Sequence, residues 1–289
     1  MSTQTAIRIE NLTHIYSPKT AFEKTALDNI NIEVRKGAFV GLIGHTGSGK
    51  STLVQHLNAL LKPSSGKIFI DDEDTADKER LKALRYKVGL VFQYPEHQLF
   101  EVTVAKDVAF GPKNMGLPPD EVDRRVKKAL TLVGISEELY EKSPFELSGG
   151  QKRRVAIAGV LAMEPTILIL DEPTAGLDPK GRDEILGRIK AMHEELAITV
   201  ILVSHSMEDI AKLVEQIIVI HHGRIELIGS PSEVFMQIER LESLGLGSTA
   251  TAYLADRLRQ AGYNLPSGIY TVDEAVAAIA ALLNEGGAQ

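Results

Sequence analysis

The chain has 289 residues, of which 44% are hydrophobic and 25% charged, and its formal net charge is −7. This composition is typical of a globular protein with one large domain, or one plus a small appendage, and the acidic balance argues against a nucleic-acid partner. Because the sequence contains no cysteine, disulfides, thiolate metal sites and a catalytic thiol are excluded.

The first 40 residues alternate apolar and polar positions at "AIRIENL" and "INIEV", which predicts antiparallel strands with one wet face. The extreme N-terminus lacks the basic and apolar regions of a signal peptide. No apolar run approaches the roughly 18 residues of a membrane-spanning helix, so we expect that the chain itself does not cross a membrane.

Short, nearly continuous apolar runs follow and predict strands buried on both faces in a sheet covered by helices. They lie at residues 39–44, 88–92, 167–170, 199–204 and 216–220. Helical periodicity follows Pro119, ending at Gly134, and recurs from Pro179 to Leu196. The segment from about residue 75 to 160 is interpreted as a helical insertion, and the acidic stretch 71–80 as a solvated loop entering a helix.

Beyond residue 230 the pattern changes to two helical stretches separated by a turn that contains Gly, Asn and Pro. The predicted fold class is therefore α/β, with a mostly parallel core sheet and an antiparallel β subdomain. The predicted boundaries are 1–230 for this α/β domain, about 95–160 for its helical subdomain and 231–289 for a C-terminal helical appendage.

The segment "GHTGSGKS", Gly44 to Ser51, follows an apolar run and precedes a helical one, which is the context of a phosphate-binding loop. Its glycines let several backbone N–H groups point at a phosphate chain, and a helix N-terminus adds positive potential. Lys50 is expected to reach the β- and γ-phosphates, and Ser51 to ligate Mg²⁺.

Four further candidates lie at the ends of three apolar runs, where a parallel sheet places its ligands. In "ILILDEP", Asp171 is expected to hold Mg²⁺ and Glu172 to act as the general base for the attacking water. His205 could contact the γ-phosphate, or merely cap a helix. Gln93 could contact Mg²⁺ or water.

A second anion-binding helix start lies in "FELSGGQKRR", although one nucleotide needs only one cradle. We therefore expect Ser148, Gly149 and Gly150 to meet the ATP of another subunit, so that each of two composite sites spans a two-fold interface. Binding ATP would then close a dimer.

"LSGGQ" between a phosphate loop and "LILDEP" resembles the signature of the ABC-type ATPases, over roughly residues 5–230. The resemblance implies a P-loop NTPase cassette. Its Walker A loop consists of Gly44, His45, Thr46, Gly47, Ser48, Gly49, Lys50, Ser51 and Thr52. It further implies that Tyr16 stacks on adenine, for which Phe22 is the alternative, and that Gln93 is the Q-loop glutamine. The trans-acting signature would consist of Ser148, Gly149, Gly150 and Gln151. Asp171 and Glu172 would be the Walker B residues, Asp178 the D-loop residue and His205 the switch histidine.

The loop after Gln93 is rich in aromatic and apolar residues, including Leu99 and Phe100, which indicates either a docking groove for a membrane protein or packing beneath the helical insertion. The wording "GHTGSGKSTL", "FQYPEHQLFE" and "SPFELSGGQKRRVAIAGVLAMEP" is similar to the ATPases of energy-coupling factor (ECF) importers, closer to the second of their two paralogues.

That resemblance implies a heterodimer of paralogous ATPases at the cytoplasmic face of the cell membrane. The pair would lie beneath a transmembrane coupling protein that docks near residues 93–100, with substrate-binding membrane subunits reached indirectly and C-terminal helices adding dimer contacts. It implies import of vitamins or other micronutrients. The alternatives are a homodimeric ATPase of a cobalt- or nickel-type importer, and a soluble ABC ATPase that acts on DNA or ribosomes.

Overall fold

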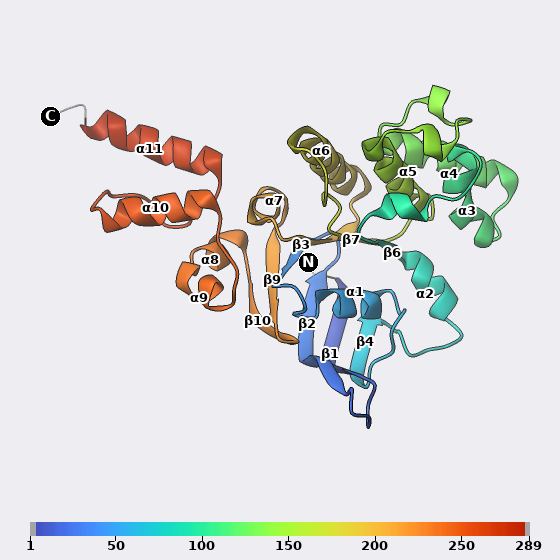
Figure 1. Cartoon of the computed structure of the whole chain (residues 1–289), viewed down its shortest axis with the longest axis horizontal. Coiled ribbons are helices and arrows are strands. Elements are labelled where there is room, and N and C mark those ends of the chain that lie inside the picture. Colours follow the sequence, from blue (N-terminus) through green and yellow to red (C-terminus); the bar gives the residue numbers. More distant parts are fainter. Residues whose placement is uncertain (1–3, 287–289) are drawn as a thin grey trace.

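The computed structural model describes residues 4–286, which form two β-sheets with helices above and beside them (Figure 1). The larger sheet has six strands in the order β10 (Arg224–Gly229), β9 (Gln216–His221), β3 (Phe39–Ile43), β8 (Thr199–Val203), β7 (Ile167–Asp171) and β6 (Val88–Val91). Every neighbouring pair is parallel except β9 with β10, which confirms the predicted, mostly parallel core. The strands β3, β6 and β8 are buried along their whole length.

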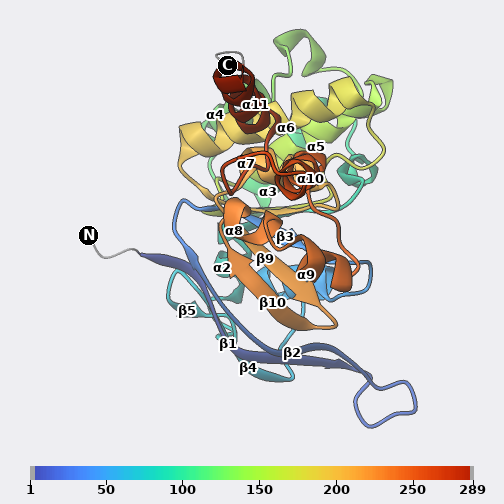
Figure 2. The same cartoon turned by 90° about the vertical axis from the view of Figure 1, so that its left-hand side faces the viewer.

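The smaller sheet is antiparallel, with the order β2 (Lys24–Arg35), β1 (Thr5–Tyr16), β4 (Ser65–Ile70) and β5 (Glu73–Asp74). Its apolar face packs on the large sheet and on α1 (Lys50–Leu57), and its other face is wet, as the alternation predicts. Figure 2 shows β1, β2 and β4 below the strands of the large sheet. Neither β4 nor β5 follows from the sequence pattern, because β4 is exposed over its first half and β5 has two residues. Apart from β5, the acidic stretch consists of turns, in keeping with the predicted loop.

The helical region comprises α3 (Val104–Asn114), α4 (Pro119–Leu132) and α5 (Gly149–Leu161), with 3-10 turns η1 (Pro95–Gln98), η2 (Glu137–Leu139) and η3 (Pro144–Glu146). These helices gather on one side of the molecule (Figure 1). The predicted start of the helical insertion, near residue 75, is wrong. The helix α2 (Leu81–Lys87) leads into β6, and β6 pairs with β7 in the core sheet. The insertion therefore begins after β6.

Two helices accompany the central strands: α6 (Pro179–Leu196) and α7 (Met207–Leu213). Asp178 caps α6 by accepting a hydrogen bond from the backbone N–H of Gly181, and Pro179 occupies the first helical position. The buried side of α6 carries Ile185, Ile189 and Met192. Both helices predicted from periodicity, α4 and α6, are thus present within a residue or two of the expected bounds.

The C-terminal segment contains α8 (Pro231–Phe235), α9 (Ile238–Ser243), α10 (Ala250–Gln260) and α11 (Val272–Gly286). The prediction of two helical stretches is wrong for the first one, which breaks into three helices. Gly245 has a left-handed φ of 71° just after α9, and Thr249 caps a new helix. Within residues 4–286, no helix is both long enough and apolar enough to span a membrane.

The C-terminal helices belong to two different cores. Val234, Phe235 and Leu241 join the main core beneath the large sheet, so the packing has no break at residue 230. In contrast, α10 and α11 form a small cluster of their own around Leu265 and Ile269. These two helices project at the opposite end of the molecule from α3–α5 (Figure 1).

Candidate nucleotide-binding site

The phosphate loop joins β3 to α1 and is fixed by glycines at both ends. A Cβ at Gly44 would lie 2.3 Å from the carbonyl oxygen of Ile220, so only glycine fits there. Gly49 precedes α1 with a φ of 113° and offers no side-chain cap. With no acidic residue in the first turn of α1, the N–H groups at this helix start stay available for an anion.

Lys50 lies against the loop that it is predicted to serve. Its side chain is buried, and Nζ donates to the carbonyl oxygens of Gly44 at 2.6 Å and His45 at 3.0 Å. Burial lowers the pKa of Lys50, while the charges of Glu172 and Asp171 oppose that change. A phosphate could replace these carbonyl contacts with a stronger, charge-assisted hydrogen bond.

Asp171 is the last residue of β7, and Glu172 follows it in an unusual backbone conformation. Burial raises the pKa of Asp171, and the charge of Lys50 opposes the rise. Glu172 has a φ of 51°, a left-handed value that a non-glycine residue rarely adopts. Burial raises the pKa of Glu172 to about 7; a hydrogen bond from the backbone of His205 lowers it, and the charge of Asp171 raises it further.

His205 stands next to Glu172, at the end of β8. Its Nε2 is 3.2 Å from Oε1 of Glu172, but the two groups are not aligned as a hydrogen bond. Oε1 is buried and has no hydrogen-bond donor among residues 4–286. Burial lowers the pKa of His205, with a further contribution from Lys50. Such a carboxylate oxygen, with its lone pairs free, is suited to accept a proton from water.

A pocket of about 300 Å³ lies beside the phosphate loop. Its walls include Tyr16 from β1, Lys50, Ser51 and Thr52 from α1, and His222 from the turn between β9 and β10. Oη of Tyr16 is 3.2 Å from Oγ1 of Thr52. The structure therefore brings Tyr16 to the phosphate loop, and its stacking on a base stays a prediction.

Gln93, Glu172 and His205 lie along one edge of the large sheet. They lie one or two residues after the ends of β6, β7 and β8, and these three strands pair in parallel. Gln93 is exposed. The carboxyl edge of a parallel sheet thus gathers an amide, a carboxylate and an imidazole from three separate segments near the phosphate loop.

The second helix start is exposed and lies outside the pocket of its own chain. Ser148 and Gln151 form a reciprocal capping box at the start of α5, with Oε1 of Gln151 2.9 Å from the N of Ser148. A Cβ added to Gly149 or Gly150 would meet nothing within 4 Å, so the glycine surface is open to an approaching group. Asp178 is exposed as well.

Arg153, which the sequence analysis did not include, links these segments. Its guanidinium donates to both carboxylate oxygens of Glu96 in η1 at 2.8 and 3.1 Å. It also donates to the carbonyl oxygens of Pro173 at 3.0 Å and Ala175 at 2.8 Å. The sequence spacing could have identified Arg153, because it lies four and eight residues before Ile157 and Leu161. This spacing places a charged residue on the buried face of α5.

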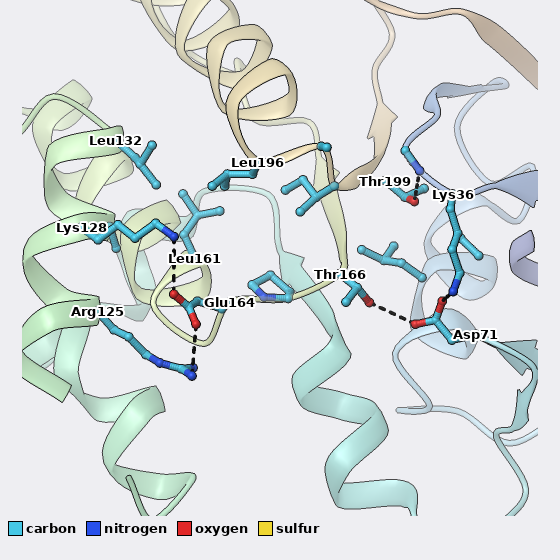
Figure 3. Close-up of a pocket in the computed structure, with 17 residues that line it drawn as sticks. Lys36, Asp71, Arg125, Lys128, Leu132, Leu161, Glu164, Thr166, Leu196 and Thr199 are labelled. Carbon is cyan, nitrogen blue, oxygen red and sulfur yellow. Dashed lines mark hydrogen bonds and ion pairs between the residues drawn. The ribbon is translucent and has the colours of Figure 1, made fainter. Parts of the chain in front are cut away.

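A larger cavity, of about 500 Å³, lies away from the phosphate loop, between α4, α5 and the edge of the sheet where β7 and β8 begin (Figure 3). Its charged groups already pair with one another. Glu164 forms ion pairs with Arg125 at 3.1 Å and Lys128 at 3.5 Å, and Asp71 forms one with Lys36 at 2.8 Å. Volume alone therefore does not identify the nucleotide site, which is defined by its anion-binding backbone and its carboxylates.

The fold and the site together define an ATP-binding cassette. The ABC transporter family matches residues 27–175. Energy-coupling factor transporter ATP-binding protein EcfA2 from Clostridium tetani is 59% identical over 272 residues, which cover 93% of this chain and 94% of that protein.

Solved structures give the same result. The structure of cbiO1 from Clostridium perfringens, part of the ABC transporter complex cbiONQ, aligns with a TM-score of 0.74 and 43% identity over 83% of this chain and 94% of that chain. A dimeric, post-hydrolysis structure of the cassette MJ0796 bound to ADP and Pi aligns with a TM-score of 0.68 and 32% identity over 78% and 98%. The chain belongs to the ABC transporter family and, within it, to the ATP-binding proteins of energy-coupling factor transporters. It is an ATPase subunit that couples ATP hydrolysis to transport.

The raised pKa of Glu172 predicts a pH dependence. If this carboxylate is the general base, ATP turnover should increase as pH rises from about 6 to about 8, because the active, ionised form is populated through its pKa of about 7. Stability should change in the opposite direction: the folded pKa exceeds the ordinary value of 4.5, so the nucleotide-free chain loses stability as pH rises between the two values.

Glu172→Gln provides the control for both measurements. It should lack turnover at every pH and should unfold at a higher denaturant concentration than the unchanged chain at about pH 8. A turnover profile that is flat through neutral pH in the unchanged protein would contradict the assignment of the base.

The contacts of Arg153 predict a large loss of stability on substitution. Arg153→Met leaves Glu96 and two loop carbonyls without their donor, and should lower the free energy of unfolding by about 3 kcal/mol in denaturant titrations. The neighbouring Arg154 pairs with the half-exposed Glu184, so Arg154→Met is the matched control and should cost at most about 1 kcal/mol. Equal losses of unfolding free energy for the two substitutions would contradict a special contribution of Arg153 to stability.

Proposed function

We propose that this chain is one of two ATPases that power an importer of vitamins or other micronutrients, by closing on ATP at a shared interface. The observation that carries this proposal is the second anion-binding helix start, at Ser148. It is exposed, its glycines face open space, and it is absent from the walls of its own chain's pocket. A partner's ATP is the group that this surface fits. The dimeric MJ0796 cassette bound to ADP and Pi supports such an arrangement.

In this proposal Gly44 to Thr52 wrap the phosphates, Lys50 contacts the β- and γ-phosphates, and Tyr16 stacks on adenine. The partner contributes its own copies of Ser148, Gly149, Gly150 and Gln151 to the γ-phosphate, and Asp178 contacts the opposite subunit. Closure excludes water from around Glu172, whose buried Oε1 accepts the proton of the attacking water. His205 positions the γ-phosphate from the adjacent strand end.

The donor set also fits Mg²⁺. Ser51, Gln93 and Asp171 offer a hydroxyl, an amide oxygen and a carboxylate, which are the hard oxygen ligands that this cation prefers. The cation, when bound, would offset the negative charge of the phosphates. Burial raises the pKa of Asp171, and the charge of Lys50 offsets part of that rise.

A groove next to Gln93 is the proposed docking surface for a transmembrane coupling protein. It has a volume of about 430 Å³ and includes Leu99, Phe100 and Phe110. The rings of Phe100 and Phe110 stand edge to face with centroids 5.0 Å apart, and both side chains are about half exposed. Their exposure together in one groove favours an apolar partner segment, such as a cytoplasmic helix of a membrane protein.

The groove is mechanically connected to the ATP site. Glu96, in the turn between Gln93 and the groove, is held by Arg153 of α5, the same helix that begins at Ser148. The carbonyls of Pro173 and Ala175, just after Glu172, complete the set of Arg153 contacts. Movement of the signature helix on closure would therefore be transmitted to the docking surface.

We further propose a heterodimer with a paralogous ATPase, peripheral to the cytoplasmic face of the membrane, in which substrate-binding membrane subunits are contacted through the coupling protein. No nucleic acid takes part. The domain assignment is an ATP-binding domain at 1–230, a helical subdomain at about 95–160 and a dimerisation segment at 231–289. The separate small core of α10 and α11 supports the last of these for the part after α9, whereas α8 and α9 pack in the main core.

Purification of the tagged chain from detergent-solubilised native membranes tests this function. We expect a paralogous ATPase and a multi-spanning protein in stoichiometric amounts, with small membrane proteins that identify the substrates. Phe100→Asp with Phe110→Asp should remove the membrane proteins, because charges in the groove oppose burial of an apolar segment. Phe145→Asp is the matched control, since Phe145 is 66% exposed in the same helical region but outside the groove.

If the chain is recovered with the membrane protein but without a second ATPase, the heterodimer is contradicted and a homodimer is favoured. Recovery from the cytosol with ribosomes or DNA would contradict the transporter assignment.

A further inference from the structure

Three histidines meet at the wall of the nucleotide site. His45 belongs to the phosphate loop, and His221 and His222 end β9 and begin the turn to β10. Ring centroids are 4.8 Å apart for His45 and His221, 5.1 Å for His45 and His222, and 4.1 Å for His221 and His222. One ring nitrogen from each residue lies within 4.8 Å of the other two.

The hydrogen bond of the His45 ring leaves its second nitrogen, Nε2, available to a metal ion. Its Nδ1–H donates to the carbonyl oxygen of Thr46 at 2.7 Å, so in the neutral ring the lone pair lies on Nε2. This Nε2 is buried and has no hydrogen-bond partner among residues 4–286. A histidine whose other nitrogen donates to a backbone carbonyl is the usual arrangement around a protein-bound metal ion.

His221 has the same feature. Its Nδ1 is buried without a hydrogen-bond partner in the described part of the chain. Buried ring nitrogens without a hydrogen-bond partner cost free energy unless a ligand completes them.

We propose that His45, His221 and His222 bind a first-row transition-metal ion, with Zn²⁺ as the representative case. Imidazole nitrogens suit Zn²⁺, Ni²⁺ and Co²⁺ rather than Mg²⁺, which prefers oxygen. Three protein nitrogens leave a fourth position for water or a phosphate oxygen. Bonds of about 2.0–2.1 Å require the three nitrogens to come closer than in this arrangement, so binding draws the rings together.

The location gives the site a consequence for the ATPase. His45 lies between Gly44 and the phosphate-binding N–H groups, and His222 is part of the wall of the nucleotide pocket. An ion held by both residues would tie the phosphate loop to the turn between β9 and β10. The site is separate from the Mg²⁺ ligands proposed above, and it does not depend on the dimer or on a membrane partner.

Zn²⁺ titration of the nucleotide-free, tag-free chain, followed by calorimetry, tests the site. We expect one Zn²⁺ per chain. His221→Gln and His222→Asn should each weaken binding at least about tenfold. Asparagine is chosen at 222 because the backbone there has a φ of 45°, which asparagine tolerates. Co²⁺ absorption should report a tetrahedral or five-coordinate site that both substitutions remove.

His193→Gln is the matched control, because that histidine lies near the end of α6 and its Nδ1 donates to the carbonyl oxygen of Ile198. It should bind Zn²⁺ as the unchanged chain does. Circular dichroism of each variant separates loss of the site from loss of folding. The proposal is overturned if the unchanged chain binds no Zn²⁺, or if folded His221→Gln and His222→Asn bind it as tightly as His193→Gln does.

Discussion

The close approach of the phosphate loop to the end of β9 is the constraint on which the site depends. Gly44 lies so near the carbonyl oxygen of Ile220 that a single added carbon would be 2.3 Å from it. This contact fixes the loop against the large sheet, whose parallel pairing then places Gln93, Glu172 and His205 along the same edge. The chemistry at this edge is therefore a consequence of strand order. The side chains themselves come from segments far apart in the sequence.

A second level of organisation connects the edge of the sheet to the helical region. Arg153 holds the turn after Gln93 and the loop after Glu172 at the same time. It lies on the helix that Ser148 begins, so one buried guanidinium joins the predicted signature, the predicted base and the predicted docking groove. A buried charge with four hydrogen bonds is costly to disturb, which suits a residue that keeps these segments in register.

The sequence predicted the parts of this structure that depend on local pattern. Apolar runs located the central strands, and proline with four-residue spacing located α4 and α6. The phosphate loop was recognisable because its function requires particular residues at fixed spacing. The exposed first half of β4 carries no apolar signal, and Gly245 with Thr249 breaks a helical pattern that continues on either side. Arg153 and the three-histidine cluster were missed because they depend on contacts between distant segments, which periodicity does not report.

The most direct test of the account is to separate ATP binding from ATP turnover at Ser148. Ser148→Arg blocks the glycine surface of the signature, which is exposed and lies outside the pocket of its own chain. The account predicts that the isolated variant binds ATP as tightly as the unchanged chain, while turnover in the assembled complex falls to background. Lys50→Ala, by comparison, should lose binding itself. If Ser148→Arg abolished ATP binding to the isolated, folded chain, the signature would serve its own nucleotide, and the trans-acting site would be contradicted.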